Sequence, residues 1–119
     1  MAGEIVHIEF ASEDADRATA FWSGLFGWEF GDSGMPGMDY RMARTGPESG
    51  AAVYASEERT GHPIYYYACD DIEASVARVV ELGGTAEPRT PVPGHGWFAA
   101  CTDSEGTVFR LWQSDEKAA

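Results

Sequence analysis

The chain has 119 residues and a mass of 12.9 kDa, the size of one ordinary domain that can bury a core without disulfide or metal cross-links. Its 4 Trp, 5 Tyr and 6 Phe residues and its hydrophobic fraction of 44% exclude a disordered chain. The formal net charge of −12 disfavours nucleic acids and anionic membranes as partners. No segment has the roughly 18 apolar residues of a membrane span, and the N-terminus does not resemble a signal peptide, so we expect a cytoplasmic protein.

The sequence contains an internal repeat. Shifting it by 57 positions aligns similar residues in the same order: Phe10 with Tyr67, Asp14 with Asp71, Leu25 with Leu82 and Gly27 with Gly84. Near the end of each copy a shift of 56 aligns Gly50 with Gly106 and Ala55 with Leu111, as expected if one loop differs by a residue. The order and spacing of these matches predict a single domain over residues 1–119, built from two modules at 1–57 and 58–119.

The first module is predicted to begin with a strand and a helix. In the strand at 6–10, Val6, Ile8 and Phe10 form an apolar face, which leaves His7 and Glu9 on the opposite face. A helix follows Asp14 and ends at Gly27, and its apolar stripe consists of Ala18, Phe21, Trp22 and Leu25. Gly and Pro residues then separate three predicted strands at 28–30, 40–44 and 51–55.

The second module repeats this order. A strand at 64–69 contains three consecutive tyrosines, of which Tyr66 points to the face opposite its neighbours. The helix that follows is predicted to be capped by Asp70 with Glu73, and to end at Gly83 and Gly84. Strands are expected at 84–87, 97–101 and 108–113, with a turn over 88–96. Each module therefore has the predicted order βαβββ.

Three segments carry a family resemblance: residues 21–28 (Phe-Trp-Ser-Gly-Leu-Phe-Gly-Trp), residues 70–74 (Asp-Asp-Ile-Glu-Ala) with Leu-Gly-Gly at 82–84, and residues 103–109 (Asp-Ser-Glu-Gly-Thr-Val-Phe). They resemble the motifs of the glyoxalase, bleomycin-resistance and extradiol-dioxygenase family, also called the vicinal oxygen chelate fold. The resemblance implies an α+β fold in which two tandem βαβββ modules form a curved mixed sheet around a cleft, with the helices outside. It also implies a homodimer.

The resemblance implies four metal-ligand positions, on the first and last strand of each module. They fall on His7, Tyr54, Ile64 and Arg110. Only His7 matches the ligands of the family's enzymes, because Ile cannot coordinate a cation and the positive charge of Arg opposes one. We therefore expect no cofactor and keep a divalent metal as the alternative. His62, two residues from Ile64, is a substitute donor if the register differs.

The candidate ligand-binding residues are polar or aromatic side chains that the predicted strands direct toward the cleft: His7, Glu9, Tyr40, Tyr54, Tyr66, Trp97, Arg110 and Trp112. Two interpretations of Arg110 stay open, an ion pair with Glu9 or a contact with an anionic group of a ligand. His7 is either a hydrogen-bonded structural histidine, a ligand-binding residue or a metal ligand. Aromatic walls with few polar groups suit a flat aromatic molecule.

These observations predict a metal-independent protein that binds or sequesters a small aromatic or polycyclic metabolite. The alternative is a divalent-metal lyase, isomerase or dioxygenase in which a carboxylate such as Glu9 moves the proton. No motif of a nucleophilic enzyme is present, so catalytic residues are not assigned. An interaction module without a ligand is disfavoured because the sequence shows no exposed apolar stripe.

Overall fold

The computed structural model describes residues 2–34, 36–57 and 62–119. The predicted boundary between modules, after residue 57, adjoins residues 58–61, which lie outside the described residues. The chain divides into two compact units, Val6–Ile64 and Tyr65–Ala119 with Met1–Ile5. In the described part of the chain, no helix is both long enough and apolar enough to cross a membrane.

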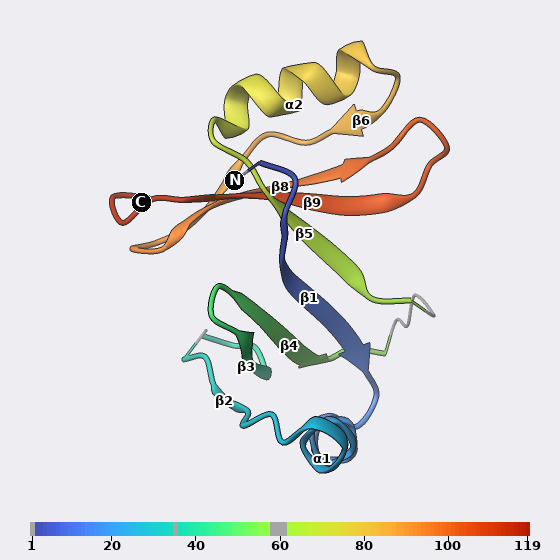
Figure 1. The fold of residues 1–119 in the computed structure, drawn as a ribbon, viewed down its shortest axis with the longest axis vertical. Helices are drawn as coiled ribbons and strands as arrows, with labels where there is room; N and C mark the ends of the chain where they lie inside the picture. Colours follow the sequence, from blue (N-terminus) through green and yellow to red (C-terminus); the bar gives the residue numbers. More distant parts are fainter. Residues whose placement is uncertain (1, 35, 58–61) are drawn as a thin grey trace. The chain divides into compact units, whose positions relative to one another are not determined.

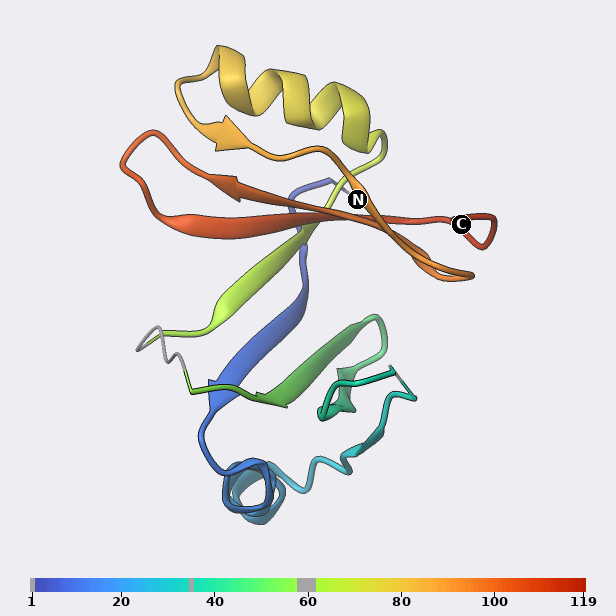
Figure 2. The same cartoon turned by 180° about the vertical axis from the view of Figure 1, so that it is seen from behind.

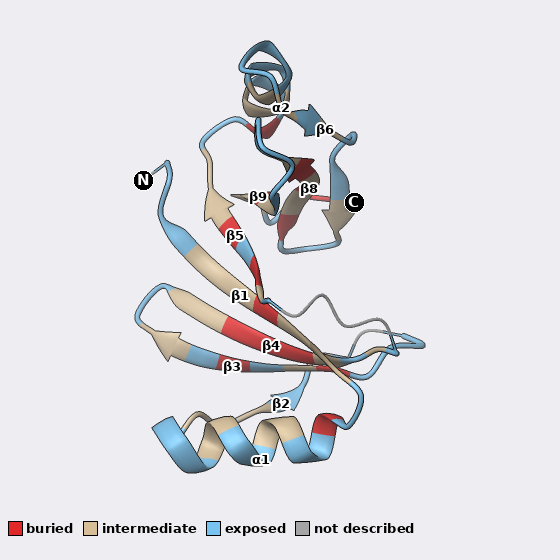
Figure 3. Ribbon diagram, turned by 90° about the vertical axis from the view of Figure 1, so that its right-hand side faces the viewer, coloured by how far each residue is buried: buried red, intermediate tan, exposed pale blue. Residues whose placement is uncertain are grey.

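The first unit is a four-stranded mixed sheet with a helix on one face (Figures 1 and 3). Its elements are β1 (Ile5–Ser12), α1 (Ala15–Phe26), β2 (Gly31–Asp32), β3 (Tyr40–Gly46) and β4 (Ser49–Ala55). The strand order is β2-β3-β4-β1, in which β1 and β4 are parallel and the other neighbours are antiparallel. Trp22 of α1 stacks on Phe10 of β1 with 4.8 Å between ring centroids. Because side chains alternate along a strand, His7 and Glu9 of β1 face away from the helix.

The second unit repeats this arrangement (Figure 2). Its elements are β5 (Ile64–Ala68), α2 (Ile72–Glu81), β6 (Thr85–Ala86), β7 (Thr90–Val92), β8 (Gly96–Thr102) and β9 (Val108–Ser114). The order is β5-β9-β8-β6, with β5 parallel to β9, and β7 also pairs with β8. Its core contains Ile72, Ala99, Cys101 and Leu111. The predicted α+β fold of two βαβββ modules is confirmed, and β7 is an additional strand within the turn predicted at 88–96.

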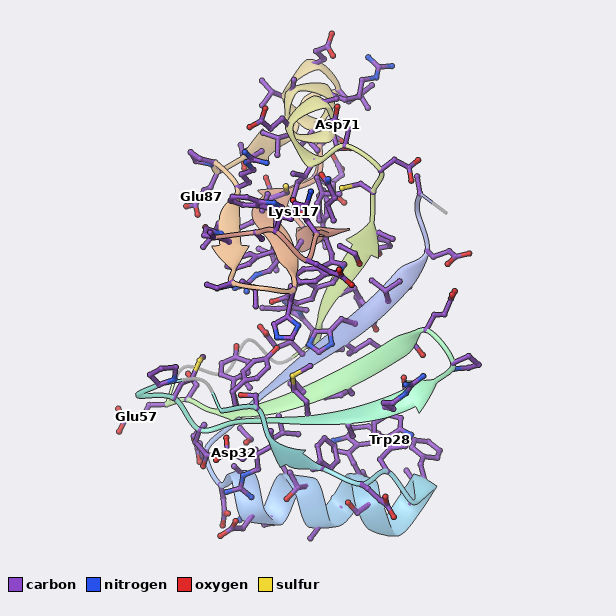
Figure 4. The ribbon with its side chains drawn as sticks, turned by 90° about the vertical axis from the view of Figure 1, so that its left-hand side faces the viewer. Trp28, Asp32, Glu57, Asp71, Glu87 and Lys117 are labelled. Carbon is purple, nitrogen blue, oxygen red and sulfur yellow. The ribbon has the colours of Figure 1, made fainter. Side chains whose placement is uncertain are left out.

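The predicted strand at 28–30 is wrong, because the strand begins only at Gly31. Trp28 instead joins an aromatic cluster on α1, with ring centroids 5.5 Å from Trp22 and 5.2 Å from Phe26. Figure 4 shows Trp28 beside this helix. Ring packing against the helix therefore holds the segment that follows α1, and strand pairing starts after it.

The structure confirms the predicted ends of α1, whereas each end of α2 differs from the prediction by one residue. Asp14 caps α1 by accepting a hydrogen bond from the backbone N–H of Arg17 at 3.0 Å. Asp71, not the predicted Asp70, caps α2 in the same way (Figure 4). At the C-terminal ends the left-handed glycines are Gly27 (φ 75°) and Gly83 (φ 97°), so the predicted equivalence of Gly27 with Gly84 is wrong. The reason is that α2, with 10 residues, is two residues shorter than α1, and Leu82 stands between its last residue and Gly83.

The parallel strand pairs correct the predicted alignment of the last strands. Phe10 pairs with Val53 in the first unit, and Tyr67, its counterpart, pairs with Leu111 in the second. Val53 and Leu111 are both buried, so they occupy equivalent core positions. The correct match is therefore Val53 with Leu111, and the predicted match of Ala55 with Leu111 is wrong.

Unequal hairpins explain this error. Only two residues separate β3 from β4, whereas five separate β8 from β9. The matched glycines, Gly50 and Gly106, therefore lie in different places: Gly50 is within β4, and Gly106 is in the turn before β9. As a consequence, the residue equivalent to Arg110 is Ala52 and not Tyr54.

The apolar stripe predicted for α1 divides between two faces of the helix. Trp22 lies against the sheet, but the side chains of Phe21 and Leu25 are 61% and 58% exposed. Phe26, which was not assigned to the stripe, is 59% exposed. The predicted single stripe is therefore wrong, because the sheet of the first unit covers only the side of α1 that carries Trp22.

We expect Gly84→Ala to destabilise the second unit. A Cβ atom at residue 84 would lie 2.3 Å from the carbonyl oxygen of Thr102 and 2.9 Å from the side chain of Val79, so the backbone has to shift. Overpacking of this kind lowers the free energy of unfolding by about 1–3 kcal/mol. Urea unfolding followed by circular dichroism measures the change. Gly31→Ala is the control, because a Cβ atom there has no neighbour within 4 Å, and an equal loss in both variants would contradict the prediction.

Candidate functional site

The first unit brings together four of the predicted site residues. His7 and Glu9 lie on the face of β1 that points away from α1, as predicted from the alternation of the strand. Tyr40 of β3 and Tyr54 of β4 are cross-strand partners, and their rings stack with centroids 6.2 Å apart. The rings of His7 and Tyr40 also stack, at 6.4 Å.

A chain of hydrogen bonds links three of these side chains. The hydroxyl of Tyr40 donates to Oε2 of Glu9 at 2.8 Å, and Nε2 of His7 lies 2.9 Å from the same hydroxyl oxygen. Because a phenol has a single proton and Tyr40 gives it to Glu9, Nε2 of His7 has to carry the proton of the second bond. The neutral ring then has its lone pair on Nδ1. Gly50 lies beside that atom, since a Cβ atom at residue 50 would be 3.5 Å from Nδ1.

Burial controls the charge of this group. Glu9 is only 5% exposed, and Tyr40 is buried as well. Burial lowers the pKa of His7 below its ordinary value, and the charge of Glu9 opposes this effect without cancelling it. The imidazole is therefore neutral near pH 7. A neutral imidazole, a phenol and a carboxylate in one hydrogen-bonded chain can orient a bound hydroxyl or carbonyl group and can hold a proton at a defined atom.

The second unit brings together Tyr66, Arg110 and a residue that the sequence did not indicate, Phe98. Nη1 of Arg110 donates to the hydroxyl of Tyr66 at 2.6 Å. The guanidinium carbon lies 5.5 Å from the centroid of the Tyr66 ring and 5.3 Å from that of Phe98, which are cation–π distances. Phe98 could have been found from the alternation of β8, because its neighbour Ala99 is a core residue.

The two remaining candidates, Trp112 and Trp97, lie on opposite faces of the second sheet. Trp112 is two residues from Arg110 on β9 and pairs with Phe98, so it shares their face. Trp97 packs against the core under α2, where Arg89 lies 3.8 Å over its ring and Asp115 accepts its Nε1–H at 3.0 Å. Trp97 therefore does not join Arg110.

The described residues do not fit the metal site that the resemblance implies. At the four positions, His7 is a donor, Ile64 and Ala52 cannot coordinate, and Arg110 is a cation. Among residues 2–34, 36–57 and 62–119, no three His, Cys, Asp or Glu side chains are grouped so that they could hold a metal ion. The substitute donor His62 is exposed and lies with its Nδ1 3.2 Å from the carbonyl of Pro63.

The two cysteines are free thiols, and neither is placed as a nucleophile. Cys101 is a core residue, and burial raises its pKa to about 11. Burial also raises the pKa of Cys69. Both side chains are therefore protonated near neutral pH, where only a thiolate would react.

We expect Tyr40→Phe to destabilise the first unit, because it removes the hydroxyl that donates to the buried carboxylate of Glu9. A hydrogen bond to a charged group contributes about 1.5–3 kcal/mol to the free energy of unfolding. Urea unfolding measures the loss. Tyr65→Phe removes the same atom from an exposed tyrosine and should change stability by less than about 0.5 kcal/mol. Equal effects of the two substitutions would show that the bond to Glu9 contributes nothing.

Two curated mycobacterial proteins resemble the chain in sequence. They carry the provisional name glyoxylase CFP32, come from Mycobacterium bovis and Mycobacterium tuberculosis, and are each 31% identical to it over 116 residues. The match covers 91% of this chain but 44% of each relative, so the chain spans less than half of their length.

Solved structures share the fold at low sequence identity. Methylmalonyl-CoA epimerase from Mycobacterium tuberculosis aligns with a TM-score of 0.74 and 14% identity over 95% of this chain and 88% of its own. The hypothetical protein BH1468 from Bacillus halodurans aligns with a TM-score of 0.75 and 18% identity, over 100% of this chain and 99% of its own. A glyoxalase/bleomycin resistance protein/dioxygenase superfamily member from Vibrio splendidus aligns with a TM-score of 0.69 and 16% identity, over 94% of this chain and 99% of its own.

The family itself is identified by the sequence match over residues 7–112, which covers the strands and helices of both modules. The matching family is the glyoxalase-like domain, in agreement with the fold of the solved structures. The resemblance seen in the motifs at 21–28, 70–74 and 103–109 is confirmed. This chain belongs to the family of glyoxalase-like domains.

Proposed function

We propose that this glyoxalase-like domain binds a small organic molecule through a carboxylate, phenolate or carbonyl oxygen, and that it does so without a metal ion. The observation that carries the proposal is the position of Arg110. The resemblance assigns this position on the last strand to a metal ligand, and here it holds a guanidinium placed against Tyr66 and Phe98. The guanidinium can donate a charge-assisted hydrogen bond to an oxygen of the ligand, in place of the metal ion that would otherwise bind that oxygen.

The surroundings of Arg110 indicate the class of ligand. Tyr66 and Phe98 lie within cation–π distance of the guanidinium, and Trp112 shares their face of the sheet. Aromatic rings around a planar cation favour a flat molecule that stacks on the rings while its oxygen accepts from the guanidinium. We therefore propose an aromatic or polycyclic metabolite with a carboxylate, phenolate or quinone oxygen, which the domain sequesters or converts.

The second candidate function is that of a divalent-metal lyase, isomerase or dioxygenase. It is favoured by His7 and Glu9, which lie on one face of β1 and are joined through the hydroxyl of Tyr40. The fold likeness to methylmalonyl-CoA epimerase also supports an enzyme. It is disfavoured because Ile64, Ala52 and Arg110 supply no donor to a cation.

We expect Arg110→Ala to weaken the binding of such ligands. Loss of a charge-assisted hydrogen bond should reduce affinity roughly 10- to 150-fold. Arg110→Lys should recover little, because a point charge lacks the planar fork of the guanidinium. Tryptophan fluorescence titration with salicylate, 2-naphthoate and 1,4-naphthoquinone measures the effect, with Trp112 on the same face as the reporter.

The matched control is Arg89→Ala. Arg89 also lies over an aromatic ring, that of Trp97, but it does so on the helix-covered side of the sheet, where it pairs with Glu73 at 3.2 Å. Its removal should leave ligand affinity unchanged. The proposal fails if Arg110→Ala binds each of these three compounds as tightly as the parent protein and Arg89→Ala do.

We expect the purified protein to hold no stoichiometric Zn, Mn, Fe or Ni. The reason is the donor set, in which a single histidine cannot replace the hydration shell of a divalent cation. Elemental analysis by mass spectrometry after exposure to each metal and desalting checks this. About one metal ion per chain, lost in His7→Ala, would overturn the metal-free proposal and favour the second candidate.

A further inference from the structure

The indole of Trp112 lies along the sheet of the second unit instead of standing out from it. Its Cζ2 and Cη2 atoms would be 2.7 and 2.9 Å from a Cβ atom at Gly96, so the indole occupies the space that a side chain there would need. Its Nε1–H donates to Oγ of Ser114 at 3.2 Å. Gly96 is buried and Trp112 is half-buried. The backbone of β8 therefore supports the six-membered ring of the indole, while a hydrogen bond holds the five-membered ring.

Two small residues are neighbours of this indole on its face of the sheet. Trp112 pairs with Ala68 of β5 on one side and with Phe98 of β8 on the other. Gly96 precedes Phe98 by two residues on β8, so it lies diagonally opposite Trp112. A methyl group at Ala68 and a hydrogen atom at Gly96 are too short to reach over the ring. These two neighbours therefore leave the outer side of the indole uncovered.

The indole and the guanidinium of Arg110 follow one another along β9. Arg110 and Trp112 are two residues apart on this strand, so they share a face and their Cα atoms are about 7 Å apart. The indole extends further from Arg110, because it lies over Gly96, which pairs with Ser114. Phe98 is beside both groups, since it pairs with Trp112 and its ring centroid is 5.3 Å from the guanidinium carbon. A cation and an extended aromatic surface are thus aligned in one direction.

We infer that Trp112 determines how many rings the ligand has, so that the domain prefers molecules with two or three fused rings in line over those with one ring. The inference rests on the proposed function, in which Arg110 binds an oxygen of the ligand. A ring next to that oxygen lies beside Phe98, and only a ligand with further rings reaches the indole. Stacking on the indole and burial of the additional rings then increase the affinity.

Gly96 and Ser114 act as positioning residues for this indole. Gly96 provides the space in which the ring lies, and Ser114 accepts the hydrogen bond of its Nε1–H. A side chain that is already held in its binding orientation loses little conformational freedom when a ligand stacks on it. The position of Trp112 in the free protein therefore favours a long planar ligand before that ligand arrives.

The experiment uses isothermal titration calorimetry of the full chain with benzoate, 2-naphthoate and anthracene-2-carboxylate, which share a carboxylate and differ in the number of fused rings. Trp112→Leu should weaken the binding of anthracene-2-carboxylate roughly 10-fold and that of benzoate less than about 2-fold, because only the longer ligand contacts the indole. The control is Tyr65→Leu, which removes an exposed ring on the face of β5 that carries the core residue Tyr67. It should leave all three affinities unchanged.

Substitutions at Ser114 test the positioning of the indole without removing it. Ser114→Ala should weaken the binding of anthracene-2-carboxylate by roughly 3-fold, because the indole loses its hydrogen bond and gains freedom. Ser114→Thr keeps the hydroxyl and should bind like the parent. Ser114 is exposed at the end of β9, so both variants should fold, and circular dichroism of every variant checks this.

Failure of this inference is distinguishable from failure of the proposed function. If Arg110→Ala weakens the binding of all three carboxylates but Trp112→Leu weakens them equally or not at all, Trp112 does not determine the number of rings, and the inference alone is overturned. The same holds if Ser114→Thr binds anthracene-2-carboxylate no better than Ser114→Ala does. If the parent binds none of the three, or if Arg110→Ala binds them as tightly as the parent, the proposed function fails and the inference fails with it.

Discussion

The parallel pairing between the first and last strand of each module determines which side chains can form a site. In the first unit, the pairs Phe10 with Val53 and Glu9 with Ala52 set the core face and the opposite face of the sheet. In the second, Tyr67 with Leu111 and Tyr66 with Arg110 do the same. A slip of one residue in either pair would move Glu9 or Arg110 into the core beneath a helix, where a charge without a partner is costly. The burial of Val53 and Leu111 therefore fixes the chemistry of the opposite face.

Local patterns sufficed for those parts of the site that depend on one strand. The alternation in β1 placed His7 and Glu9 on one face, and the run of three tyrosines in β5 separated Tyr66 from Tyr67. Both inferences rest on the period of two in a strand, which holds wherever one face is buried. The order βαβββ was also readable, because the helix caps and glycines occur at matching positions.

Features that depend on pairing between strands far apart in the chain could not be predicted from the sequence. The counterpart of Arg110 was assigned to Tyr54 because two glycines matched, and only the unequal hairpins reveal that Ala52 holds that place. Trp97 was expected to line the cleft, but the register of β8 turns it to the helix side and brings Phe98 to Arg110 instead. The exposure of Phe21 and Leu25 was missed for a related reason: a helical stripe shows which residues share a side, not how wide a surface the sheet covers.

The two units use a tyrosine hydroxyl in opposite ways. The hydroxyl of Tyr40 donates a hydrogen bond to the carboxylate of Glu9, whereas the hydroxyl of Tyr66 accepts a hydrogen bond from the guanidinium of Arg110. A hydroxyl can serve either neighbour without changing its own charge or the shape of the strand that carries it. The two tyrosines stand at different places in their modules, Tyr40 on β3 and Tyr66 on β5, so each module supplies a hydroxyl to its own charged residue from a different strand. The two modules therefore share one architecture but carry opposite charges, the carboxylate of Glu9 in the first and the guanidinium of Arg110 in the second.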